Sequence, residues 1–258
     1  MGDTATQAER GATTRPELAL PRPLWSLRRM ALIVGLPLLV VLAVFVFSLL
    51  DRRELSTTTV AGPIDRVVVQ VARGDVELVP AQPGTTDVSV ESISRWRFMR
   101  PTAEVVQAER ERDVVRIDAG CPRVVLVVGV CAVDFLIEVP PGVQVFVRTD
   151  DGEVVAEGLD GWARFVTSGG GVSATGLRSD EMLVESHGGA VDLDFASAPS
   201  RVDVTSDGGA VSLTVPDAEP YDVRTAGSSG ELDIGIEDVG DAERVLRVRG
   251  GDVTIRPT

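Results

Sequence analysis

The chain lacks Lys and Asn entirely and has only one His, one Tyr and two Cys among its 258 residues. Without Asn it has no N-glycosylation sequon, and without Lys it cannot form a Schiff base with a carbonyl substrate. A single His excludes metal sites that need two or three imidazoles, and it leaves one candidate for an imidazole general base. Aromatic residues make up only 4% of the chain, so its core must be aliphatic. These absences disfavour most classes of enzyme.

The charge balance excludes a further class of function. The formal net charge is −14, with 39 acidic residues against 25 Arg. Nucleic-acid binding needs a basic surface, so this balance argues against a nucleic-acid partner. Residues 1–29 carry five Arg and three acids, whereas residues 51–258 carry 20 Arg and 36 acids. The chain therefore begins with a short basic segment and continues as a strongly acidic one.

Residues 30–50 form an apolar run of 21 residues without a charge. At 1.5 Å per residue a helix of this length spans about 31 Å, close to the hydrocarbon thickness of a bilayer. The run is longer than the apolar part of a signal peptide, so we expect a transmembrane helix. Five Arg lie in the 20 residues before the run and three in the 20 after it. This excess predicts a cytoplasmic N-terminus and a location in the plasma membrane.

The predicted helix divides the chain into four parts. Residues 1–29 are rich in Thr, Ala and Pro and show no periodicity, which predicts a disordered cytoplasmic tail. Residues 51–63 read as a polar linker after the predicted transmembrane helix 30–50. Residues 64–258 are predicted to form an extracytoplasmic domain.

Alternating apolar and polar residues begin at Ile64, which is the pattern of β-strands. In the second half of the chain, glycine-containing turns recur between pairs of such strands, and each repeat has one strand before its glycines and one after them. Tight turns often need a positive φ, which glycine adopts without a Cβ penalty. The spacings are 18, 18, 20, 22 and 21 residues, counted between Gly152, Gly170, Gly188, Gly208, Gly230 and Gly251.

Two all-β folds agree with repeats of about 20 residues. We favour a parallel β-solenoid, in which each two-strand repeat is one coil stacked about 4.8 Å from the next. Stacking in register rewards the same residue type at the same position of every repeat, which the sequence shows. An antiparallel β-sandwich is the alternative.

The stretch Val133–Gly142 leads into Val-x-Val-x-Val-Arg-Thr and then into the glycine-rich repeats. This arrangement resembles the bacterial putative-adhesin family of β-strand-repeat domains of unknown function, in its membrane-anchored actinobacterial form. The likeness covers residues 64–258, although residues 64–130 match the repeat pattern poorly. Cys121-Pro122 and Cys131 also resemble actinobacterial members. The resemblance implies an architecture but no activity.

Cys121 and Cys131 are the two cysteines of the chain. They form no CxxC motif and have no His nearby, which argues against a metal site. If the domain lies outside the cytoplasm, a disulfide between them is the natural interpretation, with a free-thiol or redox role as the alternative.

No catalytic, cofactor-binding or metal-binding residue can be assigned from the sequence. His187 follows Ser186 in a turn whose counterparts in other repeats hold Gly169 and Asp207, so we interpret it as a surface turn residue. The acidic turn Asp150–Glu153 matches neither of the common calcium-loop patterns. We therefore expect no cofactor.

One β-face is a candidate binding surface. If Val191, Leu193 and Phe195 point inward, Asp192 and Asp194 point outward. The same positions of other repeats hold Ser, Thr and Asp, which would form two ladders. The candidate residues are Ser173, Thr175, Asp192, Asp194, Ser212, Thr214, Asp233 and Thr254. A solvated face without a ligand is the alternative, and Trp162 and Tyr221 are the only candidate outward aromatics in the repeats.

These observations lead to a non-enzymatic, adhesin-like surface module anchored by a single membrane helix. Its expected partner is an envelope protein or polysaccharide. The first alternative is a regulator that binds a membrane signalling partner, and a remote alternative is an envelope polysaccharide enzyme. The final strand, Val253–Thr258, would be an exposed edge that Pro257 protects, so we expect a mostly monomeric outer domain.

Overall fold

The computed structural model describes the chain in seven segments: residues 24–48, 51–97, 99–107, 113–122, 130–217, 220–227 and 230–258. The chain separates into two compact units, Met1–Phe47 and Ser48–Thr258. Helix α1, Leu24–Ser48, belongs to the first unit except for its last residue. Residues 1–23 of the predicted cytoplasmic tail lie outside the described residues. Residues 24–29 belong to α1, so the prediction of disorder is wrong for them. Among the described residues, no helix has the length and apolar character needed to cross a membrane.

The second unit consists of β-strands. Their bounds are β1 Arg52–Val60, β2 Arg66–Val71, β3 Val76–Pro80, β4 Val88–Trp96, β5 Thr102–Gln107, β6 Val114–Gly120, β7 Cys131–Val139, β8 Gln144–Thr149, β9 Val154–Glu157, β10 Ala163–Thr167, β11 Val172–Leu177, β12 Glu181–Ser186, β13 Val191–Phe195, β14 Arg201–Ser206, β15 Val211–Val215, β16 Tyr221–Gly227, β17 Leu232–Ile234, β18 Arg244–Gly250 and β19 Val253–Pro257. The prediction of an all-β domain is confirmed.

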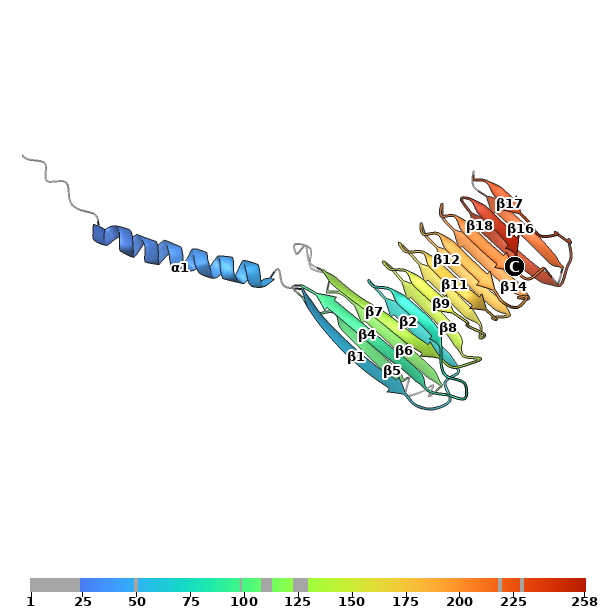
Figure 1. Ribbon diagram of the computed structural model, residues 1–258, viewed down its shortest axis with the longest axis horizontal. Coiled ribbons are helices and arrows are strands. Elements are labelled where there is room, and N and C mark those ends of the chain that lie inside the picture. Colours follow the sequence, from blue (N-terminus) through green and yellow to red (C-terminus); the bar gives the residue numbers. More distant parts are fainter. Residues whose placement is uncertain are drawn as a thin grey trace, which may run out of the picture. The chain divides into compact units, whose positions relative to one another are not determined.

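These strands form two mixed, largely parallel sheets (Figure 1). Sheet A has the order β1-β4-β7-β3-β9-β11-β13-β15-β19-β17, and sheet B has the order β16-β18-β14-β12-β10-β8-β2-β6-β5. From β8 to β15 the chain alternates between the sheets, and each strand pairs in parallel with the strand two positions along the chain. Each repeat is therefore one coil, as predicted. The antiparallel pairs lie at the end of the stack that holds β1 and β5: β1 with β4, β4 with β7, and β5 with β6.

The core lies between the two sheets and is built from stacked aliphatic positions. One row across sheet B, in register, is Val147, Phe165, Val184, Val204 and Val248, all at most 2% exposed. Burying a side chain of this size stabilises the fold by about 1.5–3 kcal/mol. A single coil would leave one side of each such residue in water, so the stack of coils is the smallest unit that can bury them.

The stacking order departs from the chain order at both ends. At the C-terminal end, β18 lies between β14 and β16, and β19 lies between β15 and β17. At the other end, β2 and β3 lie between the coils β6–β7 and β8–β9. The prediction that Val253–Thr258 is an exposed edge is wrong, because β19 is paired on both sides. The edge strands at that end are β16 and β17.

The prediction of a linker over 51–63 is also wrong. Residues 52–60 form β1, which pairs antiparallel with β4 along its whole length. As an edge strand with mostly exposed side chains, β1 needs no apolar alternation, so its polar sequence resembles a linker. Its three consecutive threonines nevertheless favour extended backbone, because they are β-branched.

A column of glycines follows one corner of the stack. An added Cβ on Gly170 would overlap the carbonyl oxygen of Gly152, one on Gly189 would overlap that of Gly170, and one on Gly209 would overlap that of Gly189. Backbone therefore packs directly on backbone from coil to coil. The sequence-based alignment had Gly188 and Gly208 in this column; they are instead left-handed turn residues, with φ of 130° and 92°.

A row of hydroxyl groups is buried beside this glycine column. Thr167 pairs with Ser186, and Ser186 pairs with Ser206, so the three residues stack in register. The hydroxyl of Thr167 donates to the Gly170 carbonyl at 2.7 Å, and that of Ser186 donates to the Gly189 carbonyl at 2.8 Å. The Ser206 hydroxyl also donates to the Gly189 carbonyl, at 3.2 Å, so the hydroxyl row supplies hydrogen-bond donors to the corner carbonyls.

Cys121 and Cys131 form a disulfide, as predicted, with a Cα–Cα distance of 6.0 Å. It joins the segment after β6 to the first residue of β7. The bond thus closes a short loop at the point where the chain crosses from sheet B to sheet A.

Replacing both cysteines by alanine is expected to lower the free energy of unfolding by about 2–3 kcal/mol, because the unfolded chain regains the entropy of the closed loop. Urea denaturation of the full chain measures this loss. The native protein in reductant should match the double variant. Equal midpoints for the oxidised protein and the double variant would contradict the expectation.

Candidate binding face

The predicted Ser/Thr/Asp ladders lie together on the outer face of sheet A. The cross-strand register places one row in the order Ser173, Asp192, Ser212, Thr254 and Asp233. Asp194 and Thr214 are paired in a second row, which continues to Arg256 rather than to another polar neutral residue. Thr175 pairs with Glu157 but leaves the second row, because the register shifts between Ala174 and Leu177. The structure therefore brings the first ladder together and interrupts the second.

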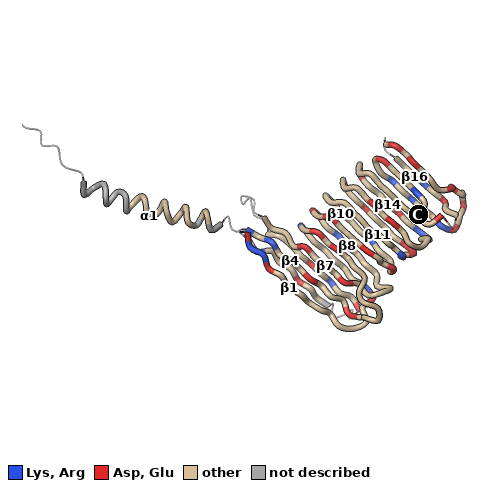
Figure 2. Tube along the Cα trace, in the orientation of Figure 1, with Lys and Arg blue, Asp and Glu red and all other residues tan. Residues whose placement is uncertain are grey.

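This face is also partly neutralised. Asp233 lies 3.6 Å from the guanidinium of Arg256, and the Asp194 carboxylate accepts a hydrogen bond from the Gly176 amide at 3.5 Å. Acidic segments recur along both sheets of this unit (Figure 2). Carboxylates on sheet A are therefore no special feature of the predicted ladders.

His187 lies in the corner between β12 and β13 and is exposed, as expected of a turn residue. Its Nδ1 is 3.2 Å from the Thr167 carbonyl oxygen, and its Nε2 is 3.8 Å from an Asp207 carboxylate oxygen. Its structural counterparts are Ser168 and Asp207, as the matching corner hydrogen bonds show, so the sequence alignment was right for Asp207 and one residue out for Gly169. Ser186 directs its hydroxyl to a glycine carbonyl rather than to the imidazole.

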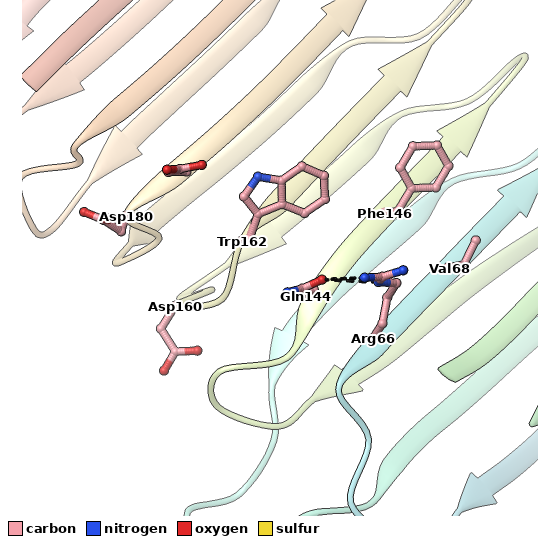
Figure 3. A pocket seen from close by; sticks show the side chains of 8 residues that line it. Arg66, Val68, Gln144, Phe146, Asp160, Trp162 and Asp180 are labelled. Carbon is pink, nitrogen blue, oxygen red and sulfur yellow. Dashed lines mark hydrogen bonds between the residues drawn. The ribbon is translucent and has the colours of Figure 1, made fainter. Parts of the chain in front are cut away.

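A better-defined hollow lies on the outer face of sheet B. We call it the aromatic groove; it has a volume of about 710 Å³ (Figure 3). The lining residues are Arg66, Val68, Gln144, Phe146, Asp160, Trp162, Asp180 and Glu181. They come from the first residues of β2, β8 and β12 and from the corners before β10 and β12. The parallel register thus gathers residues that are far apart in the sequence.

The floor of the aromatic groove is apolar. Trp162 is 36% exposed, and Phe146 lies half-buried one strand away. The guanidinium of Arg164 stacks over the Phe146 ring at 5.7 Å from its centroid and pairs with Glu185 at 2.8 Å. This pairing holds the Phe146 ring against its neighbours. The partly exposed indole of Trp162 therefore lies beside a half-buried aromatic ring on the outer face of sheet B.

Polar groups border this floor. Two nitrogens of Arg66 donate to the side-chain oxygen of Gln144, at 3.2 and 3.0 Å. Asp160 accepts from the Gly142 amide at 2.8 Å. In Figure 3, Asp160 lies below the groove and its carboxylate points away from the indole. The border thus offers the Gln144 amide and the Arg66 guanidinium beside the partly exposed ring.

Asp180 occupies the equivalent border one coil further along. It accepts hydrogen bonds from the Ser200 amide at 3.2 Å and from the Ser200 hydroxyl at 2.8 Å. Figure 3 shows its carboxylate at the edge of the groove, turned away from Trp162. Asp160 and Asp180 therefore organise the corners and do not converge on a common point above the floor, unlike the two carboxyls of a glycosidase.

The sequence indicated only part of this groove. Trp162 was one of two candidate outward aromatics, and the structure leaves it exposed. The other, Tyr221, is 1% exposed and donates its hydroxyl to the Pro216 carbonyl at 3.1 Å. Phe146 was missed, although alternation indicates its direction: it lies between the inward Val145 and Val147 and shares the outward phase of Gln144.

Comparisons with known proteins give little further information. No protein-family model matches the chain, and a search of curated proteins finds no match. A search of solved structures finds a "putative cell adhesion protein" from Clostridium sporogenes. The two share 8% sequence identity, and the match covers 81% of this chain and 99% of that one, with a TM-score of 0.40.

Proposed function

We propose that the unit Ser48–Thr258 is a non-enzymatic binding module that holds a cell-envelope polysaccharide in the aromatic groove. The observation that carries this proposal is the exposed indole of Trp162 on a rigid sheet, bordered by hydrogen-bonding side chains. A sugar ring has an apolar face and a rim of hydroxyls. An aromatic side chain offers the first a large flat contact, and planar polar groups bind the second.

The proposal includes attachment to the plasma membrane through residues 30–50, with the N-terminus in the cytoplasm. Its support is the uncharged apolar run and the Arg excess before it. A binding module needs no reactive group, in keeping with the single His and the absence of Lys. In this function the partner is a polysaccharide, and no cofactor is required.

Changing Trp162 to Ala is expected to weaken polysaccharide binding at least about tenfold, because central aromatic contacts dominate binding energy. The full chain, in a detergent without sugar groups, is applied to an array of bacterial envelope glycans. Trp162→Phe should retain part of the affinity, since it keeps a ring.

Trp96→Ala is the matched control, because Trp96 lies on β4 of sheet A, away from the groove. It should bind glycans like the native protein. Equal binding by Trp162→Ala and the native chain would exclude the groove as the site. Capture of a membrane protein with no glycan bound would favour a regulator of a signalling partner instead.

A further inference from the structure

A second hollow lies on sheet B, towards the C-terminal end of the stack. We call it the arginine hollow; it has a volume of about 330 Å³. The side chains that matter here are Arg224, Arg247, Arg249, Asp203, Thr205 and Thr225, from β14, β16 and β18. Figure 2 shows basic segments near β14 and β16. Three arginines around one hollow are unexpected in a chain with a net charge of −14.

The strand register explains how close these arginines are. Arg247 lies directly opposite Arg224 on the neighbouring strand, and Arg249 is two residues further along the same strand. Neighbouring strands are about 4.8 Å apart and alternate residues about 6.6 Å apart. Like charges placed directly opposite each other destabilise a sheet unless an anion lies between them.

The described carboxylates neutralise this cluster only in part. Asp222 binds Arg224 at 2.6 Å, and this hydrogen bond raises the pKa of the Arg224 guanidinium. Asp203 lies 3.9 Å from both Arg247 and Arg201, too far for a hydrogen bond to either. Arg249 is exposed and makes no hydrogen bond or ion pair with any residue that the structure describes. Donors on Arg247 and Arg249 are therefore available to a ligand.

A guanidinium presents planar, forked donors that fit the oxygens of an oxyanion. The guanidiniums of Arg247 and Arg249, beside the Asp222-paired Arg224, offer enough donors for the three oxygens of a phosphoryl group. The hydroxyls of Thr205 and Thr225 add two more donors at the same hollow. The geometry points to a site for a single phosphoryl group.

We propose that the arginine hollow binds a phosphoryl substituent on the same polysaccharide that the aromatic groove binds, an inference that rests on the proposed function. The two sites share the outer face of sheet B, and β10 is three strands from β18, about 14 Å. Residues 51–258 carry 20 Arg and 36 acids, so a polymer with a high density of negative charge would be repelled. A glycan with sparse phosphoryl groups avoids this repulsion.

The test uses the full chain on an array in which each phosphorylated oligosaccharide is printed beside its phosphatase-treated form. The native protein should prefer the phosphorylated form about tenfold. Arg249→Gln should remove most of this preference. Asp203→Asn should increase it several-fold, because the competing carboxylate of the hollow is lost. A purely structural role for Asp203 predicts no such gain.

Arg256→Gln is the matched control, since Arg256 is in the same coil but on the opposite sheet. It should leave the preference unchanged. Urea denaturation confirms that each variant is folded. Trp162-dependent binding without a phosphoryl preference would overturn the arginine hollow and leave the proposed function intact. If Trp162→Ala keeps both the phosphoryl preference and the affinity of the native protein, the result would support the arginine hollow and refute the aromatic groove. Full competition by millimolar inorganic phosphate with no gain from the glycan would overturn the link to a polysaccharide.

Discussion

Deleting the last residues, 244–258, is expected to unfold most of the unit Ser48–Thr258, whereas excising the longer internal segment 220–243 should leave it folded. The deletion removes β18 and β19, which lie inside the stack. It takes away Leu246 and Ile255, both fully buried, together with other core residues of that coil. The loss exceeds about 5 kcal/mol, which is comparable to the whole stability of a typical domain.

The deletion also leaves the coil of β16 and β17 without the coil on which it packs. In sheet B, β16 pairs only with β18, and in sheet A, β17 pairs only with β19, within the part of the chain that the structure describes. Without the last coil neither strand has a partner. Their apolar residues, which include the buried Tyr221, would then be exposed to water.

The internal excision restores a regular coil. Residues 196–200, five residues, connect Phe195 to Arg201, and Arg201 is the structural counterpart of Val245. After removal of 220–243, residues 216–219 and Arg244 connect Val215 to Val245, again five residues. The chain can therefore pass from β15 into β18 as it passes from β13 into β14. Only the outermost coil is lost.

Circular dichroism and urea denaturation of the truncated variant and the excision variant measure the difference in their stability. The excision variant should unfold cooperatively, with a stability reduced by a few kcal/mol. The truncated variant should have a lower strand content at 25 °C and no cooperative transition. A truncated variant as stable as the excision variant would mean that the last coil is not internal.

Replacing Gly189 by Ala is the point substitution with the largest expected effect, a loss of about 3–5 kcal/mol in the free energy of unfolding. The added Cβ would overlap the carbonyl group of Gly170 in the neighbouring coil. A backbone carbonyl cannot rotate away as a side chain can, so the two coils must separate. The backbone of Gly189 is not in the left-handed region, so close approach alone requires glycine there.

Two other glycines separate the causes. Gly240→Ala should change stability little, because its Cβ would meet nothing within 4 Å and its backbone is not left-handed. Gly188→Ala also meets open space, but its φ of 130° adds strain, so we expect an intermediate loss. Thermal denaturation should rank the variants 189, 188, 240 from least to most stable. A midpoint for Gly189→Ala within about 2 °C of the native value would refute the close-packed column.

The sequence predicted the middle of the fold well and its ends poorly. Between Val143 and Val215 the repeat period, the alternation and the glycines all describe one local rule, which stacking in register enforces at every coil. The positions of β2–β3 and β18–β19 follow no local rule, because an inserted coil has the same residue pattern as a neighbouring one. Pattern alone therefore identifies a coil but does not give its place in the stack.

The candidate site was harder to predict for a related reason. Alternation correctly placed Asp192 and Ser212 on the outside of sheet A, next to each other. The aromatic groove depends on the contact of Gln144 with Arg66, 78 residues away, which no local pattern of the sequence indicates. Charge counting also concealed the arginine hollow, because a net value averages over faces that the fold keeps apart.

The inserted coils have a consequence for the order in which this protein folds. A regular solenoid can add each coil to the end of the stack as the ribosome delivers it. Here the strands β16 and β17 leave the ribosome before the coil on which they dock, and β2 and β3 precede both of their neighbours. The outer coil at that end of the stack can therefore be completed only after β18 and β19 have been translated. A chain whose synthesis stops before β18 leaves β16 and β17 without strand partners. These exposed strands would make the chain a substrate for quality-control proteases.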